Sequence, residues 1–134
     1  MLVEIFEGYW TVDDVRKRKD MIFVFGDNDC KLGTKGQALI RYEKNSHGIP
    51  TKKYPGYNKS AYYSDDDFDD NKEKITNAIQ QLVEKLKDNK YVGVFFPKDG
   101  LGTGLADLAN KAPKTFHFLN SELEKVKKII EKIE

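Results

Sequence analysis

Residues 91–110, YVGVFFPKDGLGTGLADLAN, contain the pattern that decides the fold. The apolar run from Val92 to Phe96 is too short for a buried helix and ends at Pro97, which predicts an interior strand. Three glycines follow at alternate positions, and residues 105–109 then have the pattern of a helix start. A strand, a glycine-rich loop and a helix start together present backbone N–H groups to an anion, most often a phosphate. The stretch matches neither the GxxxxGKS/T pattern nor GxGxxG, so a phosphate site and a plain tight turn both remain open.

The same order of elements occurs earlier in the chain. The run MIFVF at residues 21–25 predicts a central strand, because a strand covered on both faces has no polar alternation. Residues 26–36 form a loop with three glycines, and residues 37–41 have the pattern of a helix start. In open α/β sheets, ligands bind beyond the carboxyl ends of the strands. We therefore expect the loops at 26–37 and 98–105 to face each other across one crevice.

The rest of the chain alternates between strand and helix patterns. Its expected elements are a strand at residues 2–6, a short helix capped by Thr11 and ending near Lys19, an extended piece at 48–51, a brief edge strand at 61–63, a long helix from Ser64 to about Asn89, a strand at 115–119, and a closing helix that begins with a capping box of Ser121 and Glu124. This order predicts one α/β domain over residues 1–134, a three-layer sandwich with a mixed, mainly parallel sheet. The apolar stripe of the closing helix should pack on the sheet or, alternatively, form a homodimer contact.

Composition limits the class of protein. The 134 residues include 23 Lys and Arg against 22 Asp and Glu, a balance that disfavours a nucleic-acid or membrane partner. No apolar segment is long enough to span a membrane, the N-terminus has no signal-peptide pattern, and one cysteine, Cys30, fits a reducing compartment. We therefore expect a cytoplasmic protein. Helix capping explains the acidic cluster at 65–70 better than metal binding does, and the sequence indicates neither a metal nor a cofactor.

Few residues have a pattern that indicates catalysis, since GxSxG, HExxH, CxxC and paired carboxylates are all missing from the sequence. Asp27 and Asn28 directly follow a buried strand, where they could orient a ribose hydroxyl or a water; capping of the turn by their side chains is an equal alternative. His47 has two readings: an acid or base, or a loop histidine that bonds its neighbours. Asp27 and Asn28 are the predicted catalytic residues.

Four motifs, taken in order, carry a resemblance to a known family. They are G-D-N at 26–28, G-x-x-G-Q-A at 33–38, G-I-P-T-K at 48–52 and P-K-D-G-x-G-T-G-L-A at 97–106. The series resembles small, mostly uncharacterised bacterial and bacteriophage proteins with macro-domain-like folds, and it covers residues 21–118. Macro domains bind ADP-ribose through a strand-end loop that bears asparagine and through a second, glycine-rich loop around the diphosphate. Asn28 with residues 33–36 resembles the first loop and residues 100–104 resemble the second, although the N-A-A-N and triple-glycine motifs of macro domains do not occur in this sequence.

The resemblance and the two loops together imply a set of site residues. Backbone amides from Gly100 to Leu105 would hold phosphates, and Lys98 would neutralise their charge. The residues expected to bind the ligand are Gly26, Gly33, Gly36, Gln37, Lys98, Asp99, Gly100, Gly102, Thr103, Gly104 and Leu105. Contacts to a base or ribose are expected from Arg41, His47, Thr51, Lys52 and Tyr54. Replacing Gly102 with valine should abolish binding and leave the fold intact.

Three functions remain open at this point. The first is a binder of an ADP-ribose-type or related nucleotide, which in a bacteriophage could act against host defence by sequestering a nucleotide immune signal. The second is a hydrolase of an ADP-ribosyl or phosphoester bond, with Asp27 or Asn28 orienting the water. The third is a ligand-free interaction or inhibitor module that uses the tyrosine-rich loop at 52–63.

Overall fold

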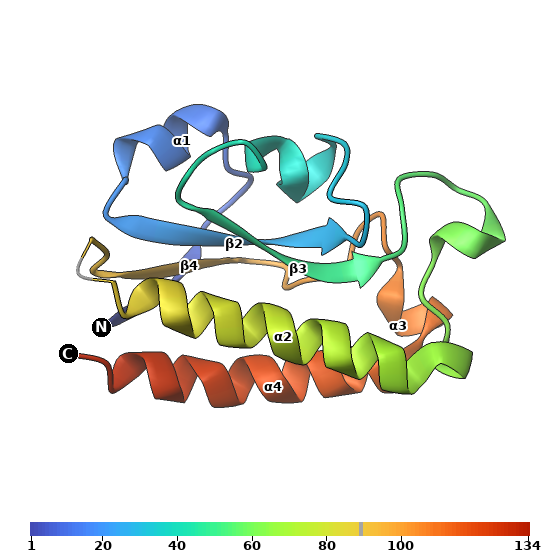
Figure 1. Ribbon diagram of the computed structural model, residues 1–134. Coiled ribbons are helices and arrows are strands. Elements are labelled where there is room, and N and C mark those ends of the chain that lie inside the picture. Colours follow the sequence, from blue (N-terminus) through green and yellow to red (C-terminus); the bar gives the residue numbers. More distant parts are fainter. Residues whose placement is uncertain (89) are drawn as a thin grey trace.

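A computed structural model describes residues 1–88 and 90–134 of the chain. Four parallel strands form one sheet in the order β1-β4-β2-β3, which confirms the α/β class (Figure 1). The strands are β1 (Leu2–Phe6), β2 (Met21–Asn28), β3 (Ser46–Lys52) and β4 (Gly93–Pro97). The sheet was expected to be mixed, but every strand pair within it is parallel. Antiparallel pairing is limited, in the described residues, to an isolated bridge between Lys52 and Tyr62.

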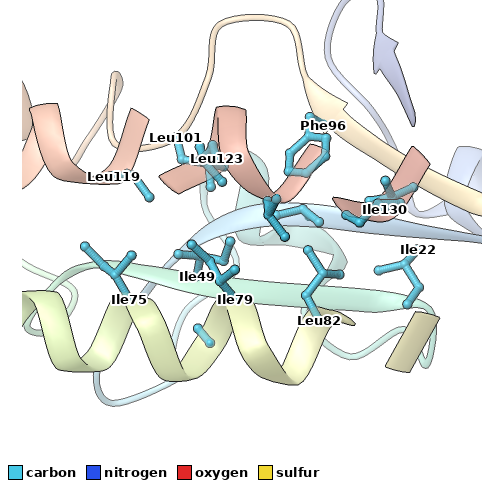
Figure 2. Packing of buried hydrophobic residues seen from close by; sticks show 14 of the residues in the cluster. Ile22, Ile49, Ile75, Ile79, Leu82, Phe96, Leu101, Leu119, Leu123 and Ile130 are labelled. Atoms are coloured by element: carbon cyan, nitrogen blue, oxygen red, sulfur yellow. The ribbon is translucent and has the colours of Figure 1, made fainter. Parts of the chain in front are cut away.

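Helices cover both faces of this sheet (Figure 1). The face covered by α1 (Val12–Lys17) and the 3₁₀ helix η1 (Gly36–Ile40) contains a small cluster of Phe, Trp, Ile, Met and Val side chains. The face covered by α2 (Phe68–Leu86) and α4 (Pro113–Glu131) contains the larger aliphatic core, where side chains of both helices meet those of the strands (Figure 2). The two central strands are the continuous apolar runs of the sequence, since residues 21–25 and 93–97 are all buried.

The first helix begins as the sequence predicts. Thr11 is the N-cap: its hydroxyl accepts a hydrogen bond from the Asp14 N–H at 3.2 Å, and the Asp14 carboxylate accepts one from the Thr11 N–H at 2.7 Å. Trp10 and Val15 flank this box and are both buried in the small cluster. The helix ends at Lys17, two residues before the expected end.

The strand expected at residues 115–119 is wrong, because these residues lie inside α4. That helix begins at Pro113, and its first amides are capped from outside: the Asp65 carboxylate accepts from the N–H of Lys114 at 3.0 Å and of Thr115 at 3.2 Å. The capping box of Ser121 and Glu124 is also wrong, since both residues lie in the helix interior. The buried positions of α4 keep a helical spacing from its first turn onward, namely Thr115, Leu119, Leu123, Val126 and Ile130.

The middle of the chain is more regular than expected. The extended piece at 48–51 is part of the seven-residue strand β3, and residues 61–63 contribute the isolated bridge and the end of a 3₁₀ helix, η2 (Lys59–Ala61), in place of an edge strand. Ser64 caps a single 3₁₀ turn, η3 (Asp65–Asp67), which leads directly into α2. That helix ends at Leu86, and the expected end at Asn89 lies outside the described residues.

Candidate ligand-binding crevices

The loops that follow β2 and β4 border a crevice of about 660 Å³ at the carboxyl edge of the sheet, which we call the first crevice. Its walls are residues 8–10 after β1, Gly26 and Thr51 at the ends of β2 and β3, residues 35–37 and 39 around η1, and residues 97–99 and 102–106 after β4. Segments that are far apart in the sequence therefore meet here, because neighbouring parallel strands end at the same edge.

The loop after β4 is held by two leucines. Leu101 and Leu108 are fully buried in the larger core, and the Leu108 N–H donates to the Gly102 carbonyl at 2.9 Å. The helix α3 (Leu108–Lys111) therefore begins three residues later than the sequence suggested, and it has only four residues. The apolar side chains that were read as a helix start serve to fix the loop on the core.

Between these two leucines lie backbone donors without partners. The five N–H groups from Gly102 to Ala106 donate to no backbone or side-chain acceptor among the described residues. All five residues line the first crevice, and Gly102 and Ala106 are buried. Thr103, Gly104 and Leu105 are exposed, so water can reach their N–H groups, whereas buried N–H groups are almost always hydrogen-bonded in folded proteins. The N–H groups of the two buried residues therefore make this loop a candidate place for an acceptor from outside the chain.

The glycines of this loop differ in what they tolerate. Gly102 has φ +75°, and a Cβ there would lie 3.0 Å from two side-chain atoms of Leu108. Valine at this position would strain the backbone and collide with the core, so the expectation that Gly102→Val leaves the fold intact is wrong. Gly104 has no positive φ, and a Cβ there would meet no atom within 4 Å. A test of the loop therefore belongs at Gly104.

Gln37 connects the two loops. Its side-chain oxygen accepts from the Gly26 N–H at 2.9 Å, and its side-chain nitrogen donates to the Gly100 carbonyl at 2.9 Å. The Gln37 carbonyl in turn accepts from the Trp10 indole N–H at 3.1 Å. Because both ends of the amide are used within the protein, Gln37 acts here as a brace that sets the distance between the loops. Gly100 contributes to that brace and does not line either crevice.

Asp27 and Arg41 form a buried ion pair behind the first loop. The Arg41 Nη1 lies 2.6 Å from the Asp27 Oδ1, and the two side chains are 6% and 9% exposed. Arg41 also donates to the carbonyls of Gly33 and Leu32, at 2.8 and 3.0 Å, so it ties the loop to the end of β2. The glycine at position 48 makes room for the pair, since a Cβ there would lie 2.5 Å from the Asp27 Oδ2.

The Asn28 side chain closes a turn of its own loop. Its Oδ1 accepts from the N–H of Cys30 at 3.1 Å and of Leu32 at 3.4 Å, and its Nδ2 donates to the Leu32 carbonyl at 2.8 Å. This is the capping alternative that the sequence left open for Asn28. Asp27 and Asn28 both line a crevice, yet their polar groups are already engaged with the protein.

A second crevice, of about 530 Å³, adjoins the first. It lies between the end of β2 with the loop that follows it, residues 26–34, and the segment at 51–57. It shares five wall residues with the first crevice: Gly26, Lys35, Thr51, Leu105 and Ala106. Gly33 and Lys52 line the second crevice, whereas Gly36, Lys98, Asp99, Thr103 and Gly104 line the first. Most of the residues expected to bind a ligand are thus brought to one edge of the sheet.

Three expected contact residues lie elsewhere. His47 belongs to β3 and is 6% exposed, and its Nε2–H donates to the Ala78 carbonyl of α2 at 2.7 Å. Burial lowers its pKa to about 4. The Tyr54 hydroxyl bonds the Ser60 hydroxyl, and Arg41 is occupied by Asp27. None of the three lines either crevice. His47 is therefore separated from any ligand in the crevices.

The sequence reasoning missed Tyr9 and Trp10, which line the first crevice. Tyr9 is 91% exposed, whereas Trp10 is buried and fixed by its bond to Gln37. Both follow the carboxyl end of β1, the neighbour of β4. The rule that placed the other two loops at this edge would have found them, had the edge strand been considered.

Residues 1–88 and 90–134 contain no group of three or more His, Cys, Asp or Glu side chains that could hold a metal ion. No helix in these ranges has the length and apolar character needed to cross a membrane.

Residues 5–122 match DUF7831, a family of unknown function. No match was found among curated proteins or solved structures.

Proposed function

Because the chain belongs to the DUF7831 family of unknown function, its activity has to be argued from the site, and we propose that it binds a phosphate-bearing nucleotide of the ADP-ribose type in the first crevice. The observation that carries this proposal is the run of five backbone N–H groups from Gly102 to Ala106, which have no acceptor in residues 1–88 and 90–134. A phosphate offers several acceptor oxygens to adjacent donors at once, which is the common use of such loops.

The surroundings of the loop favour an anion. Lys35 and Lys98 line the first crevice, and Lys98 is 59% exposed with only a distant contact, 3.7 Å, to the exposed Glu7. A carboxylate from Asp99 also lines the crevice, so the net charge of these side chains is +1. The glycines at 102 and 104 keep the loop free of side-chain atoms where a phosphate would approach the backbone.

The remaining walls suit the organic part of a nucleotide. The volume of about 660 Å³ is in the range of sites that enclose small-molecule ligands. Tyr9 offers an exposed aromatic ring at the rim, on which a base could stack. The macro-domain-like motif order makes ADP-ribose the first ligand to test within this class.

Binding without turnover fits this site better than hydrolysis does. The Asp27 carboxylate is neutralised by Arg41, and the Asn28 amide is held by its own loop. The Asp27 Oδ1 already lies 2.6 Å from the Arg41 Nη1, so this carboxylate holds the loop and does not face a bound water. A protein that sequesters a nucleotide signal needs only the binding step.

The test is a thermal-shift titration against ADP-ribose, NAD, cyclic ADP-ribose and ADP. A ligand at one hundred times its Kd adds about 2.7 kcal/mol to the free energy of unfolding, which raises the Tm of a domain this size by several degrees. Gly104→Asp should abolish the shift, because it places a carboxylate beside the donors, and should leave the Tm of the free protein nearly unchanged.

Gly104→Asn is the matched control, since it adds a side chain of the same size without a charge. It should weaken binding far less than Gly104→Asp does. No shift with any of the four compounds, or equal loss in both variants, would contradict a phosphate site in this loop. An interaction module built on the tyrosine-rich segment would then be the function to test.

A further inference from the structure

Lys52, at the end of β3, is a buried cation that lines the second crevice. The residue is 7% exposed, and its ammonium forms no ion pair with a carboxylate of the described residues within 4.0 Å. Lysine is rarely this buried unless its charge is paired. The charge of Lys52 therefore needs an explanation from its surroundings.

The protein satisfies this ammonium only in part. Its Nζ donates to the Gly56 carbonyl at 2.5 Å, and it lies 4.6 Å from the ring centre of Tyr62 and 5.3 Å from that of Tyr57. An ammonium has three N–H donors, and aromatic faces offset only part of its lost hydration. Burial accordingly lowers the pKa of Lys52.

The carboxylates near this crevice are already neutralised. Asp27 is paired with Arg41, and Asp29 accepts from the Lys74 ammonium at 2.8 Å and from the Tyr63 hydroxyl at 2.5 Å. Lys35, by contrast, lines the crevice and has no carboxylate within 4.0 Å among the described residues. The second crevice thus has an excess of positive charge on its walls.

We propose that the second crevice is a second anion subsite, in which Lys52 binds a phosphate or carboxylate group of the ligand. This inference rests on the proposed function, because it assigns the second crevice to another part of the molecule held by the loop after β4. The two crevices share the wall formed by Gly26, Lys35, Thr51, Leu105 and Ala106, so one ligand can reach both. The ligand class is then a nucleotide with two separate anionic groups, one at the amides of residues 102–106 and one at Lys52.

The experiment follows backbone amide and lysine side-chain resonances by NMR while inorganic phosphate or acetate is added at constant ionic strength. Phosphate should move two sets of signals with separate saturation curves. One set comes from residues 102–106, and the other comes from residues 52–57 together with the Cε–Hε signal of Lys52. Acetate moving the second set at lower concentration than phosphate would identify that subsite as a carboxylate site.

Variants show which residue is responsible for each set of NMR signal changes. Lys52→Met keeps the length of the side chain and removes its charge, so it should abolish the response of residues 52–57 and retain that of residues 102–106. Gly104→Asp should do the opposite. Lys59→Met is the matched control, since it removes a lysine charge from an exposed position of the same segment and should change neither set.

The outcomes separate the two proposals. If residues 102–106 do not respond and residues 52–57 do, the proposed function fails and the Lys52 subsite stands as a separate anion site. If the Lys52 Cε–Hε signal of the wild-type protein does not move with either anion, the second subsite is overturned, whether or not Lys52→Met folds. A response of residues 52–57 that survives in a folded Lys52→Met protein would overturn it as well.

Discussion

The loop after β2 and the loop after β4 begin at neighbouring strand ends and both contain glycines, but they use their polar groups in opposite ways. In the first loop, Asp27, Asn28 and Arg41 bond one another or the loop backbone. In the second loop, the N–H groups of residues 102–106 have no acceptor within the part of the chain that the structure describes. The polar groups of the first loop thus hold the loop itself, and the backbone of the second is the surface to which we propose that a ligand binds. Similar sequence patterns at one sheet edge can therefore have different roles.

The largest effect on stability should come from breaking the ion pair between Asp27 and Arg41 behind the loop after β2. Arg41→Met leaves the Asp27 carboxylate buried without its partner, which should lower the free energy of unfolding by about 3–5 kcal/mol. Urea denaturation at pH 7 measures this change. The double variant Asp27→Asn with Arg41→Met removes the charge as well and should lose less stability than Arg41→Met alone. Asp27→Asn alone completes the comparison. If the free energy of unfolding falls in the double variant by the sum of its falls in the two single variants, the ion pair is not what holds the loop.

Stability and ligand affinity should depend differently on pH, because His47 titrates in the core and the loop after β4 binds through backbone amides. His47 has a folded pKa of about 4, below its usual value of 6.5, because it is buried. The contribution of neutral His47 to the free energy of unfolding is complete above pH 6.5. It is lost as the pH falls from about 6.5 to about 4, since in that range only the unfolded chain takes up the proton. The loss is about 3 kcal/mol over that range.

Denaturation curves of the wild-type protein and of His47→Gln, at steps between pH 7 and pH 4, measure this contribution. Glutamine can still donate to the Ala78 carbonyl but does not titrate, so the variant should have a flatter pH profile. Ligand affinity should not follow the His47 titration, because backbone amides do not titrate in this range and His47 lines neither crevice. An affinity that falls with the same midpoint would place His47 in contact with the site.

The smallest effect should come from the brace between the loops. Gln37→Met keeps the side-chain length but leaves the Gly26 N–H and the Gly100 carbonyl without their partner, at about 1–3 kcal/mol of stability. The variant should also bind the nucleotide more weakly, because the loop after β4 loses its tether. Gln37→Glu retains the acceptor for Gly26 and should be intermediate in both measurements. Unchanged binding in a destabilised Gln37→Met protein would show that the loop after β4 keeps its geometry without the brace.

Local sequence determined the elements whose signals are contiguous. The strand at 2–6 and the Thr11 cap are as the sequence predicted, and both central strands lie at the predicted apolar runs, because an apolar run or a capping box acts within a few residues. The first central strand is longer than predicted, since β2 continues through residues 26–28, which were expected to begin the loop. The α4 helix was misread since its N-terminal cap comes from Asp65, about fifty residues earlier in the chain. A strand pattern in TFHF could not be rejected without that distant contact.

The candidate site divides in the same way. The sequence by itself determined that two glycine-containing loops follow buried strands, and hence that they end at one edge of a parallel sheet. The tertiary structure alone decided which polar groups in those loops remain without a partner. Arg41 neutralises Asp27, Gln37 joins the loops, and Leu101 and Leu108 fix the backbone between them. The physical reason is that hydrogen bonds and ion pairs form between groups that are close in space, and spacing along the chain does not reveal which groups those are.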